Sequence, residues 1–449
     1  MTLTEAAALV RGDLLGADRE FSSVTTDTRR LAGGELFVAL KGEHYDGHDF
    51  LQQARERGAA GALVQRADAA GLSQIRVGDA QVALGALAAG WRLRFEIPVL
   101  AVTGSNGKTT VKEMVAAILR TRAAGLATTG NLNNEIGVPL TLLRLRASDR
   151  FAVIEMGMNH AGEISRLARM TRPSVAVITN AQSAHLEGLG TVEAVARAKG
   201  EIFEGLAPDG VAIINADDPH ASLWRRLAGS RRVVSFGLRA PAEVSADYRL
   251  EDAATPMTIR ARAGEVALRL PLAGTHNALN ALAASAACLA VGADLTQIRA
   301  GLETLRPVPG RLHLKAGRNG ARIYDDSYNA NPDSVRAAVA VLAAAPGERL
   351  LVLGDMAELG AGGAELHRDV GAAVRAAGIE HFFALGAFSR HAVAAAGPAA
   401  RHFESHEALA AAAETLLHPG LTVLVKGSRR MHMEDIVAAL TGAPGGGTH

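Results

Sequence analysis

The stretch that most constrains this chain is IPVLAVTGSNGKTTVKEMVAAIL, residues 97–119. An apolar run, a turn with two glycines and a segment of helical periodicity follow one another, which predicts a strand, a tight loop and a helix. The glycines allow successive N–H groups to converge on phosphate oxygens, and the start of a helix favours an anion. We therefore predict a phosphate-binding loop made of Gly104, Ser105, Asn106, Gly107, Lys108, Thr109 and Thr110.

This loop is shorter than the common pattern G-x-x-x-x-G-K-[ST], whose first glycine would fall at Val102. In such loops the lysine, here Lys108, brings a mobile charge to the β- and γ-phosphates, and Thr109 offers a hydroxyl to Mg²⁺. The chain has six lysines among its 47 basic residues, so lysine at 108 fits a task that arginine fills poorly. A glycine turn with an incidental lysine is the alternative, and the strand–turn–helix context favours nucleotide binding.

Strand-like and helix-like segments alternate through most of the 449 residues, which predicts an α/β fold with largely parallel sheets. Two prolines and a glycine in RPVPGRL predict a hinge. Strands are expected in ELFVAL and GALVQ before the helix-like QVALGALAAGWRLRF, and in ARIYDDS, RLLVLGD, HFFALG and LTVLVKG after the hinge. We place three domains at 1–82, 83–308 and 309–449: a small α/β domain, a central P-loop domain with a parallel sheet, and a Rossmann-like domain.

The composition limits the classes of partner. The net charge of +1 gives no global basic field for nucleic acid or for an anionic membrane surface. Cys288 is the only cysteine, so no disulfide forms within the chain, and neither a signal-peptide pattern nor a long apolar run is present. Much of the 48% hydrophobic content is alanine, which predicts closely packed helices. We expect a soluble cytoplasmic protein whose tail, TGAPGGGTH, is disordered.

A lysine stands on the apolar face of the stretch VEAVARAKGEIFEGL, residues 192–206. Its apolar residues recur at helical spacing and share that face with Lys199, whereas Glu193, Arg197 and Glu201 share the other face and suit ion pairs. A buried ammonium is costly unless it is paired, or unless the amine changes its protonation or chemistry. Two interpretations remain open: a lysine that snorkels at the rim of the core, and an amine kept for its reactivity.

Two loops after apolar strands carry further candidates. Glu155 ends the strand in AVIEMG, where strand ends line the crevice of an open α/β sheet, and its carboxylate suits Mg²⁺. His185 follows the strand in AVITN. The alternatives are a surface carboxylate and a structural histidine.

Candidates for the rest of a nucleotide lie on both sides of the hinge. Asn277 and Asn280 share a helix face, where their amides could meet the edge of adenine; plain capping with Thr275 as N-cap is the alternative. Arg311 lies just past the hinge and could reach a γ-phosphate. Asp325 and Asp326 end a strand and could hold a ribose hydroxyl, or could simply form a turn. This distribution suggests a nucleotide bound between domains that close.

Ordered motifs from about residue 22 to residue 436 resemble the Mur ligases. They are TGSNGKTTVKEM, TTGNLNNEIGVPLTLL, IEMGMNHAGEI, SAHLEG, ARAKGEIF, GTHNALNALAA, PVPGRL, DDSYNANPDS, GDMAELG and VKGSR. In addition, TTDTRRLAGGELFVALKGEHYDGHDF is similar to the UDP-binding domain of two branches of this family. A shortened phosphate loop is normal in the family.

The resemblance implies an ATP-dependent, amide-forming ligase of peptidoglycan precursor synthesis. DSYNANPDS and GDMAELG favour the branch that adds D-alanyl-D-alanine to UDP-N-acetylmuramoyl-tripeptide through an acyl phosphate. We expect a monomer. The alternatives are a ligase with another acceptor, such as the tripeptide-forming branch or folylpolyglutamate synthase, and a regulatory nucleotide-binding protein. The absence of an Asp-Asn-Pro-Arg-type motif and the UDP-domain sequence count against both of these ligases, and the full catalytic set counts against the regulatory protein.

The resemblance also implies roles for single residues. Lys108 and Arg311 would contact the γ-phosphate, and Thr109 and Glu155 would hold one Mg²⁺. His185 and Lys199 would serve a second metal, with Lys199 converted to a carbamate by CO₂. The remaining assignments are Asn277 and Asn280 to adenine, Asp326 to ribose, Thr28 and Arg29 to the uridine diphosphate, Asn133 to the substrate, and Lys426, Ser428 and Arg429 to the acceptor carboxylate.

Overall fold

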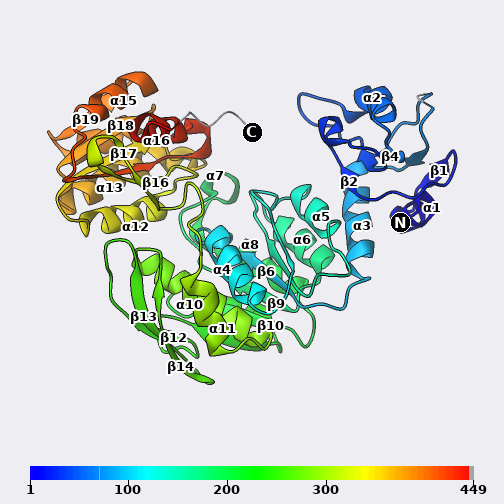
Figure 1. Ribbon diagram of the computed structural model, residues 1–449, viewed down its shortest axis with the longest axis horizontal. Helices are drawn as coiled ribbons and strands as arrows, with labels where there is room; N and C mark the ends of the chain where they lie inside the picture. The colour runs from blue at the N-terminus through cyan, green and yellow to red at the C-terminus, as the bar shows by residue number, and fades with distance from the viewer. Residues whose placement is uncertain (70, 444–449) are drawn as a thin grey trace.

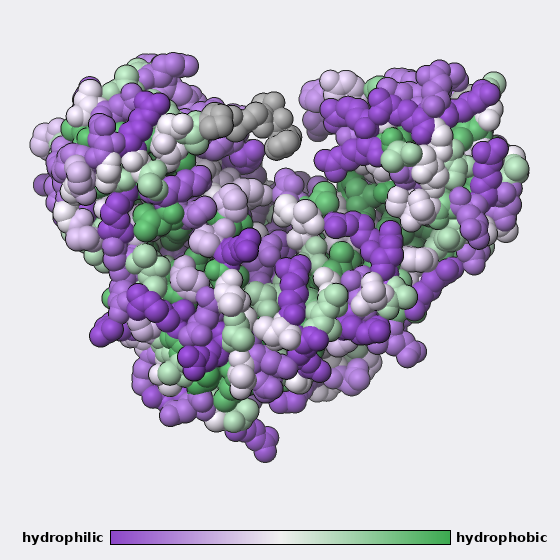
Figure 2. Space-filling view, viewed as in Figure 1, coloured by the Kyte–Doolittle hydropathy of each residue, from purple (hydrophilic) through white to green (hydrophobic). Residues whose placement is uncertain are grey.

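The computed structural model describes residues 1–69 and 71–443, and it confirms the α/β fold. Figure 1 shows three bodies: the N-terminal one in blue, the central one in cyan and green, and the C-terminal one in yellow to red. Each is built on its own sheet. The two terminal bodies stand on the central one, and Figure 2 shows a recess between them. Residues 444–449 of the expected disordered tail lie outside the described residues.

The N-terminal sheet has five strands in the order β1-β5-β4-β3-β2 and is antiparallel only at β1. Its strands are β1 (Asp13–Leu15), β2 (Val24–Thr25), β3 (Leu36–Val38), β4 (Gly61–Val64) and β5 (Gln74–Arg76). The body also contains helices α1 (Leu3–Val10) and α2 (Leu51–Glu56). Because β3 and β4 fall in ELFVAL and GALVQ, those two strand predictions are confirmed.

Helix α3 (Ala80–Arg92) joins the N-terminal body to the central one. The Asp79 carboxylate caps this helix by accepting from the N–H groups of Gln81 and Val82. Along its length α3 packs against α1 and also against α5 (Gly137–Leu142) and α6 (Glu163–Thr171). The boundary that we place between residues 82 and 83 therefore falls inside a helix that both bodies share, and our three-domain division stays a proposal.

The central sheet has six parallel strands in the order β11-β10-β9-β6-β8-β7. They are β6 (Val99–Thr103), β7 (Leu126–Ala127), β8 (Ala152–Glu155), β9 (Val175–Ile178), β10 (Val211–Asn215) and β11 (Arg232–Phe236). The four interior strands are buried along their whole length, as continuous apolar runs in a sheet covered on both faces must be. In such a sheet the carboxyl ends of the strands form one edge, where ligands bind.

The alanine-rich helices pack closely, as the composition predicts. Helix α10 (Thr275–Ala290) lies against α4 (Lys108–Arg120), and its alanines from 281 to 287 are fully buried. Helix α11 (Leu295–Glu303) approaches α4 so closely that a Cβ on Gly301 would lie 2.4 Å from Ile118 Cα. Helices α7 (Leu186–Leu189), α8 (Val192–Gly200) and α9 (Ala221–Ala228) complete the helices of this body.

A three-stranded antiparallel sheet at the lower edge of the central body was not predicted. Its strands are β12 (Ser245–Tyr248), β13 (Thr255–Ala261) and β14 (Gly264–Leu270). One face of this sheet is open, so its residues alternate between polar and apolar and give no continuous apolar run.

The C-terminal sheet has the order β15-β16-β20-β17-β18-β19, parallel except for β15. Its strands are β15 (His313–Ala316), β16 (Arg322–Asp326), β17 (Glu348–Gly354), β18 (His381–Leu385), β19 (Ala400–Phe403) and β20 (Leu421–Lys426). Its helices are α12 (Pro332–Ala343), α13 (Gly363–Ala376), α14 (Ser389–Ala396), α15 (His406–Glu414) and α16 (Glu434–Thr441). The four strands predicted after the hinge are confirmed, whereas the edge strands β15 and β19 were missed.

Candidate active site

The phosphate loop joins β6 to α4 at the carboxyl edge of the central sheet, as predicted. Gly104 and Gly107 have φ values of +151° and +83°, which side chains with a Cβ rarely adopt. A Cβ at Gly104 would lie 1.8 Å from Thr179 Oγ1, and one at Gly107 would lie 2.3 Å from Asn280 Oδ1. Both glycines are therefore required by local space, and the second brings the loop against α10.

Lys108 folds back over the loop. Its ammonium donates to the carbonyl oxygens of Gly104 at 2.7 Å and Ser105 at 3.2 Å. Burial and the charge of the neighbouring Arg311 lower the pKa of Lys108 to about 8, although Glu155 and Glu358 act in the opposite direction. These carbonyl contacts hold the amine beside the loop backbone, where a phosphate would give it a stronger partner.

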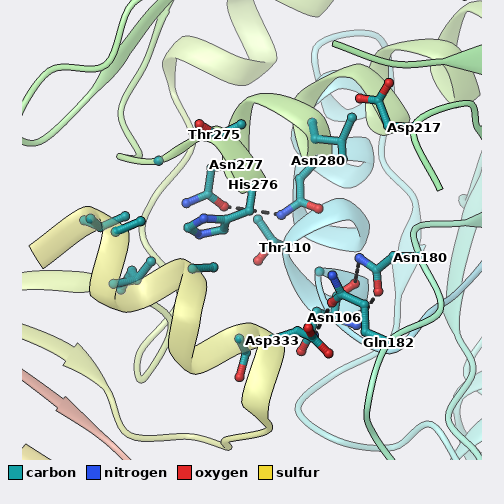
Figure 3. Close-up of a pocket in the computed structure, with 18 of the residues that line it drawn as sticks. Asn106, Thr110, Asn180, Gln182, Asp217, Thr275, His276, Asn277, Asn280 and Asp333 are labelled. Carbon is teal, nitrogen blue, oxygen red and sulfur yellow. Dashed lines mark hydrogen bonds between the residues drawn. The ribbon is translucent and has the colours of Figure 1, made fainter. Parts of the chain in front are cut away.

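The polar residues of the loop are held by the segment that follows β9. The N–H of Asn106 donates to Asn180 Oδ1 at 2.9 Å, and its side-chain amide donates to Gln182 Oε1 at 2.6 Å. Ser105 Oγ accepts from the N–H of Gln182 at 2.9 Å. Figure 3 shows Asn106, Asn180 and Gln182 gathered at this point. Asn180 and Gln182 were not predicted as site residues.

Glu155 ends β8 and is buried next to the loop. One carboxylate oxygen accepts from Asn133 Nδ2 at 2.8 Å, so the two residues predicted here are brought together. The other oxygen is buried and has no hydrogen-bond partner among the described residues. An orphaned carboxylate oxygen is costly by itself, and it is a suitable ligand for a hard cation.

His185 meets a residue from the C-terminal body. It precedes α7 with a φ of +58°, and its Nδ1 lies 2.7 Å from Glu358 Oε2. The N–H of Glu187 donates to the carbonyl of Glu358 at 3.1 Å. Burial lowers the pKa of His185, and so do the positive charges of Lys108 and Lys199. Glu358 belongs to the GDMAELG motif, so the motif was noticed in the sequence but this contact was not.

Lys199 points into the core, as its position on the helix predicts, with 1% of the residue exposed. Within residues 1–69 and 71–443 its ammonium has no hydrogen-bond or ion-pair partner, and Lys108 is the charge that acts on it. Burial and that positive charge lower the pKa of Lys199 well below its ordinary value. The opposite face was predicted only in part: Arg197 pairs with Glu193 at 2.7 Å, but Glu201 instead accepts from the N–H groups of Gly162 and Ser165.

A cavity of about 610 Å³ lies between the central and C-terminal bodies. Asn277 and Asn280 of α10 line it together with His276, and Asn280 Nδ2 donates to Asn277 Oδ1 at 3.3 Å (Figure 3). The alternative of Thr275 as N-cap is wrong, because Gly274 occupies that position and Thr275 is the first helical residue. His276 was not predicted; the packing around its ring lowers its pKa to about 4.

The C-terminal body closes the other side of this cavity. Arg311 and Asp326 both line it, so residues separated by the hinge from the phosphate loop reach the same space. The Arg311 guanidinium lies over the Tyr328 ring, 4.1 Å from its centroid. Lys426 Nζ lies 2.5 Å from Asp326 Oδ2, so Lys426 also faces the cavity. Asp325 instead pairs with Lys315 at 2.7 Å.

The structure places the other predicted substrate residues apart from the cavity. Thr28 lies in the N-terminal body, buried, with its hydroxyl donating to Gln53 Oε1 at 2.5 Å. Arg29 is exposed and pairs with Asp27 at 2.9 Å. Ser428 is buried in the C-terminal body, and its hydroxyl has no partner among the described residues. Arg429 pairs with Glu434 at 2.7 Å.

No group of three or more His, Cys, Asp or Glu side chains is arranged as a metal site in the described part of the chain. Glu155 and His185 therefore need further oxygen ligands before either could hold an ion firmly. Phosphate oxygens, the Thr109 hydroxyl and a modified Lys199 are the sources that the site offers.

None of the described helices is long and apolar enough to cross a bilayer.

Comparison with known proteins identifies the relatives of this site. Three family models match: "Mur ligase family, catalytic domain" at residues 20–92, "Mur ligase middle domain" at 102–288, and "Mur ligase, glutamate ligase domain" at 310–429. UDP-N-acetylmuramoyl-tripeptide–D-alanyl-D-alanine ligase of Escherichia coli (strain K12) is 46% identical over 98% of both chains.

Solved structures agree along nearly the whole chain. A crystal structure of MurF from Acinetobacter baumannii has a TM-score of 0.92 and 36% identity over 97% of both chains. MurF ligase from Thermotoga maritima in complex with ADP has a TM-score of 0.85 and 27% identity, covering 94% of this chain and 97% of that one. With matching models in all three bodies and a relative of this identity over its full length, this chain belongs to the Mur ligase family.

Proposed function

We propose that this chain is the ATP-dependent ligase that joins D-alanyl-D-alanine to UDP-N-acetylmuramoyl-tripeptide. The observation that carries the proposal is the cavity between two bodies, which the phosphate loop lines from one side and Arg311 and Asp326 line from the other. The full-length relative from Escherichia coli bears the name of this activity. The MurF structure with ADP supports nucleotide binding by this fold.

The first step activates the tripeptide. An oxygen of its terminal carboxylate attacks the γ-phosphorus of ATP, and the bond to the bridging β–γ oxygen breaks. ADP departs, and the tripeptide now carries an acyl phosphate. Lys108 and Arg311 would neutralise the charge that spreads over the transferred group, because Lys108 is held at the loop backbone and Arg311 is close enough to lower the pKa of Lys108. Two cations from two bodies can act on one phosphate only when the bodies are close, so closure and catalysis are linked.

The second step forms the amide. The neutral amine of D-alanyl-D-alanine attacks the acyl carbon, and a tetrahedral intermediate collapses with loss of phosphate and of the amine proton. Glu358 lies at the junction of the two bodies and contacts His185, so the attacking amine would arrive near this pair. Ser428, a buried hydroxyl without a partner among the described residues, is a suitable donor to the acceptor's carboxylate.

Mg²⁺ fits the residues of this site. The orphaned oxygen of Glu155 is a hard ligand, and Thr109 follows Lys108 at the start of α4. A bound Mg²⁺ would offset the negative charge of the phosphates. The chain's own part is to hold these oxygens, through Asn133 on Glu155 and through the glycine turn on Thr109.

Lys199 completes a second cation site if its amine is carbamylated. The ammonium first gives up a proton; the neutral amine then adds to the carbon of CO₂ and loses a second proton, which leaves a carboxylate-like anion. The lowered pKa of Lys199 favours the neutral amine that this reaction needs. Together with His185 the carbamate would supply hard oxygen and imidazole ligands, which the unmodified side chains do not.

One assay tests the function as a whole. Purified protein is given ATP, Mg²⁺ and UDP-N-acetylmuramoyl-tripeptide, with and without D-alanyl-D-alanine, and ADP release and product mass are measured. We expect release to require both substrates and a product heavier by the dipeptide minus water. Equal release without the dipeptide would favour a regulatory ATPase. We further propose that the enzyme acts as a monomer in the cytoplasm, which light scattering and cell fractionation would test.

A further inference from the structure

A reciprocal amide pair connects the phosphate loop to the C-terminal body. Asn331 Nδ2 donates to Asn106 Oδ1 at 2.8 Å, and Asn106 Nδ2 donates to Asn331 Oδ1 at 3.1 Å. The two residues are 225 positions apart, and Asn331 is buried. Two carboxamides can each donate and accept, so they close a ring of two hydrogen bonds that no pair with a carboxylate or hydroxyl reproduces.

Further contacts fix the orientation of both amides. Asn331 is the N-cap of α12, and its Oδ1 accepts from the N–H of Ser334 at 2.9 Å, which leaves Nδ2 to face the loop. Asn106 Nδ2 also donates to Gln182 Oε1 at 2.6 Å, which leaves its Oδ1 to face Asn331. The pair is therefore held in register from both sides.

A second contact lies beside the first. Asp333, in the first turn of α12, accepts from the N–H of Ser183 at 2.9 Å, and Ser183 follows the segment that holds the phosphate loop. Figure 3 shows Asn106 and Asp333 at the junction of the phosphate loop with the yellow helix α12. The start of α12 thus docks on the central body through hydrogen bonds at two successive points.

The segment that leads into α12 docks on the central body, and the same segment carries residues of the cavity that belong to the C-terminal body. Asp326 lines the cavity, and the Tyr328 ring packs against the guanidinium of Arg311. We propose that Asn331 is a positioning residue: its amide pair with Asn106 sets the distance between the phosphate loop and the Arg311–Asp326 side of the cavity. This proposal rests on the proposed function for its catalytic consequence but not for the contact itself.

Loss of the amide pair should impair transfer of the phosphate but not binding of ATP. The backbone of Asn106 is already held within the central body, because Thr179 and Asn180 donate to its carbonyl at 2.6 Å and 3.2 Å. The loop therefore keeps its shape, and most of its affinity for ATP, without Asn331. What is lost is the fixed placement of Arg311, and a displacement of about 1 Å can reduce a reaction rate by up to about 100-fold.

The test uses substitutions that keep the helix cap. Asn331→Ser and Asn331→Asp both retain an N-cap acceptor, but neither can donate to Asn106 Oδ1 through an amide. We expect both to lower kcat by about 10-fold to 100-fold, with the KM for ATP within about 3-fold of the wild type. The neutral serine variant excludes the added negative charge as the cause.

Asn329→Asp is the matched control, since it makes the same change two residues away on an exposed side chain whose one hydrogen bond within the described residues is accepted from the N–H of Ala330. It should keep the wild-type kcat. A double-mutant cycle isolates the pair: in an Asn106→Ala background, Asn331→Ser should cause little further loss. If both Asn331 variants keep kcat within about 2-fold of the wild type, or if the two losses simply add, the proposal is wrong.

Small-angle scattering provides a readout that needs no ligation. An ATP analogue with the tripeptide substrate should reduce the radius of gyration of the wild type and of Asn329→Asp more than that of Asn331→Ser. An equal reduction in all three would refute the positioning role. A wild type that forms no product but contracts more than Asn331→Ser would refute the proposed function and leave the amide pair supported.

Discussion

The regions around Lys112 and Lys199 differ in what they offer to a buried lysine. The two lysines are equally buried, but only the ammonium of Lys112 has partners among the described residues. Each residue is 1% exposed and lies on a helix of the central body. The Lys112 ammonium donates to the Thr128 carbonyl at 2.8 Å and lies 2.8 Å from a carboxylate oxygen of Glu113. The Lys199 ammonium has neither kind of partner among the described residues and is repelled by Lys108.

The difference shows that burial of a charge does not by itself mark a functional residue. A buried ammonium that is hydrogen-bonded and paired has a structural explanation, and Lys112 needs no other. One that is left without partners costs stability and persists only where something else depends on it. The lack of a described partner also counts against a structural ion pair as the role of Lys199, whose residue is 1% exposed.

The largest expected effect comes from replacing Lys199. Arginine keeps the charge but cannot form a carbamate, so Lys199→Arg and Lys199→Ala should both reduce dipeptide-dependent ADP release by about 100-fold or more. Binding of an ATP analogue should stay nearly normal. Short carboxylates should restore part of the rate of the alanine variant by supplying the missing oxygen.

Carbon-13 NMR with labelled CO₂ reports on the same residue without turnover. A carbamate signal should be present in the wild type and in Lys112→Arg, and absent in Lys199→Arg. Near-normal turnover of Lys199→Arg would mean that Lys199, like Lys112, has only a structural role.

The next effect concerns Lys426, a buried lysine that is paired like Lys112 but lines the nucleotide cavity like a site residue. Lys426→Met leaves Asp326 buried without its cation, which should destabilise the C-terminal body by about 3–5 kcal/mol. Urea unfolding followed through that body measures the change. The double variant Lys426→Met/Asp326→Leu should recover much of the stability, and a failure to do so would mean that the pair is not the source of the loss.

A smaller effect is expected at Lys112 itself. Lys112→Met leaves the buried Thr128 carbonyl without its donor, at a cost of about 1–3 kcal/mol in the free energy of unfolding. The folded variant should keep most of its turnover, in contrast to Lys199→Arg. Thermal unfolding and the ligation assay, run on the same preparation, measure both. A loss of activity without a loss of stability would remove the distinction between the two lysines.

The smallest effect is a dependence of stability on pH. The pKa of Lys199 is lower in the folded chain than in the unfolded one, so between those two values the unfolded state binds more protons. Stability should therefore rise with pH across that window, by at most about 1.4 kcal/mol per pH unit for one group. Urea titrations in CO₂-free buffer from neutral to alkaline pH should show a shallower rise for Lys199→Met than for the wild type. Identical slopes would mean that folding does not lower the pKa of Lys199.

The sequence alone determined the features that depend on neighbours along the chain. The glycines of the phosphate loop, the apolar strands of the two large sheets and the inward position of Lys199 follow from local backbone requirements and from periodicity, which a few consecutive residues encode. Even there, local rules were wrong where tertiary contacts compete: Glu201 binds the start of α6 rather than Arg197, and Gly274 rather than Thr275 is the N-cap of α10.

Only the tertiary structure decided which distant groups meet. Asn106 and Asn331 are 225 residues apart, and Lys426 is 100 residues from Asp326; no periodicity links such positions. The contact of His185 with Glu358 likewise depends on how the central and C-terminal bodies come together. These pairs form because strand order and helix packing bring loops of different bodies to one edge, a long-range arrangement that the residues of each loop do not specify by themselves.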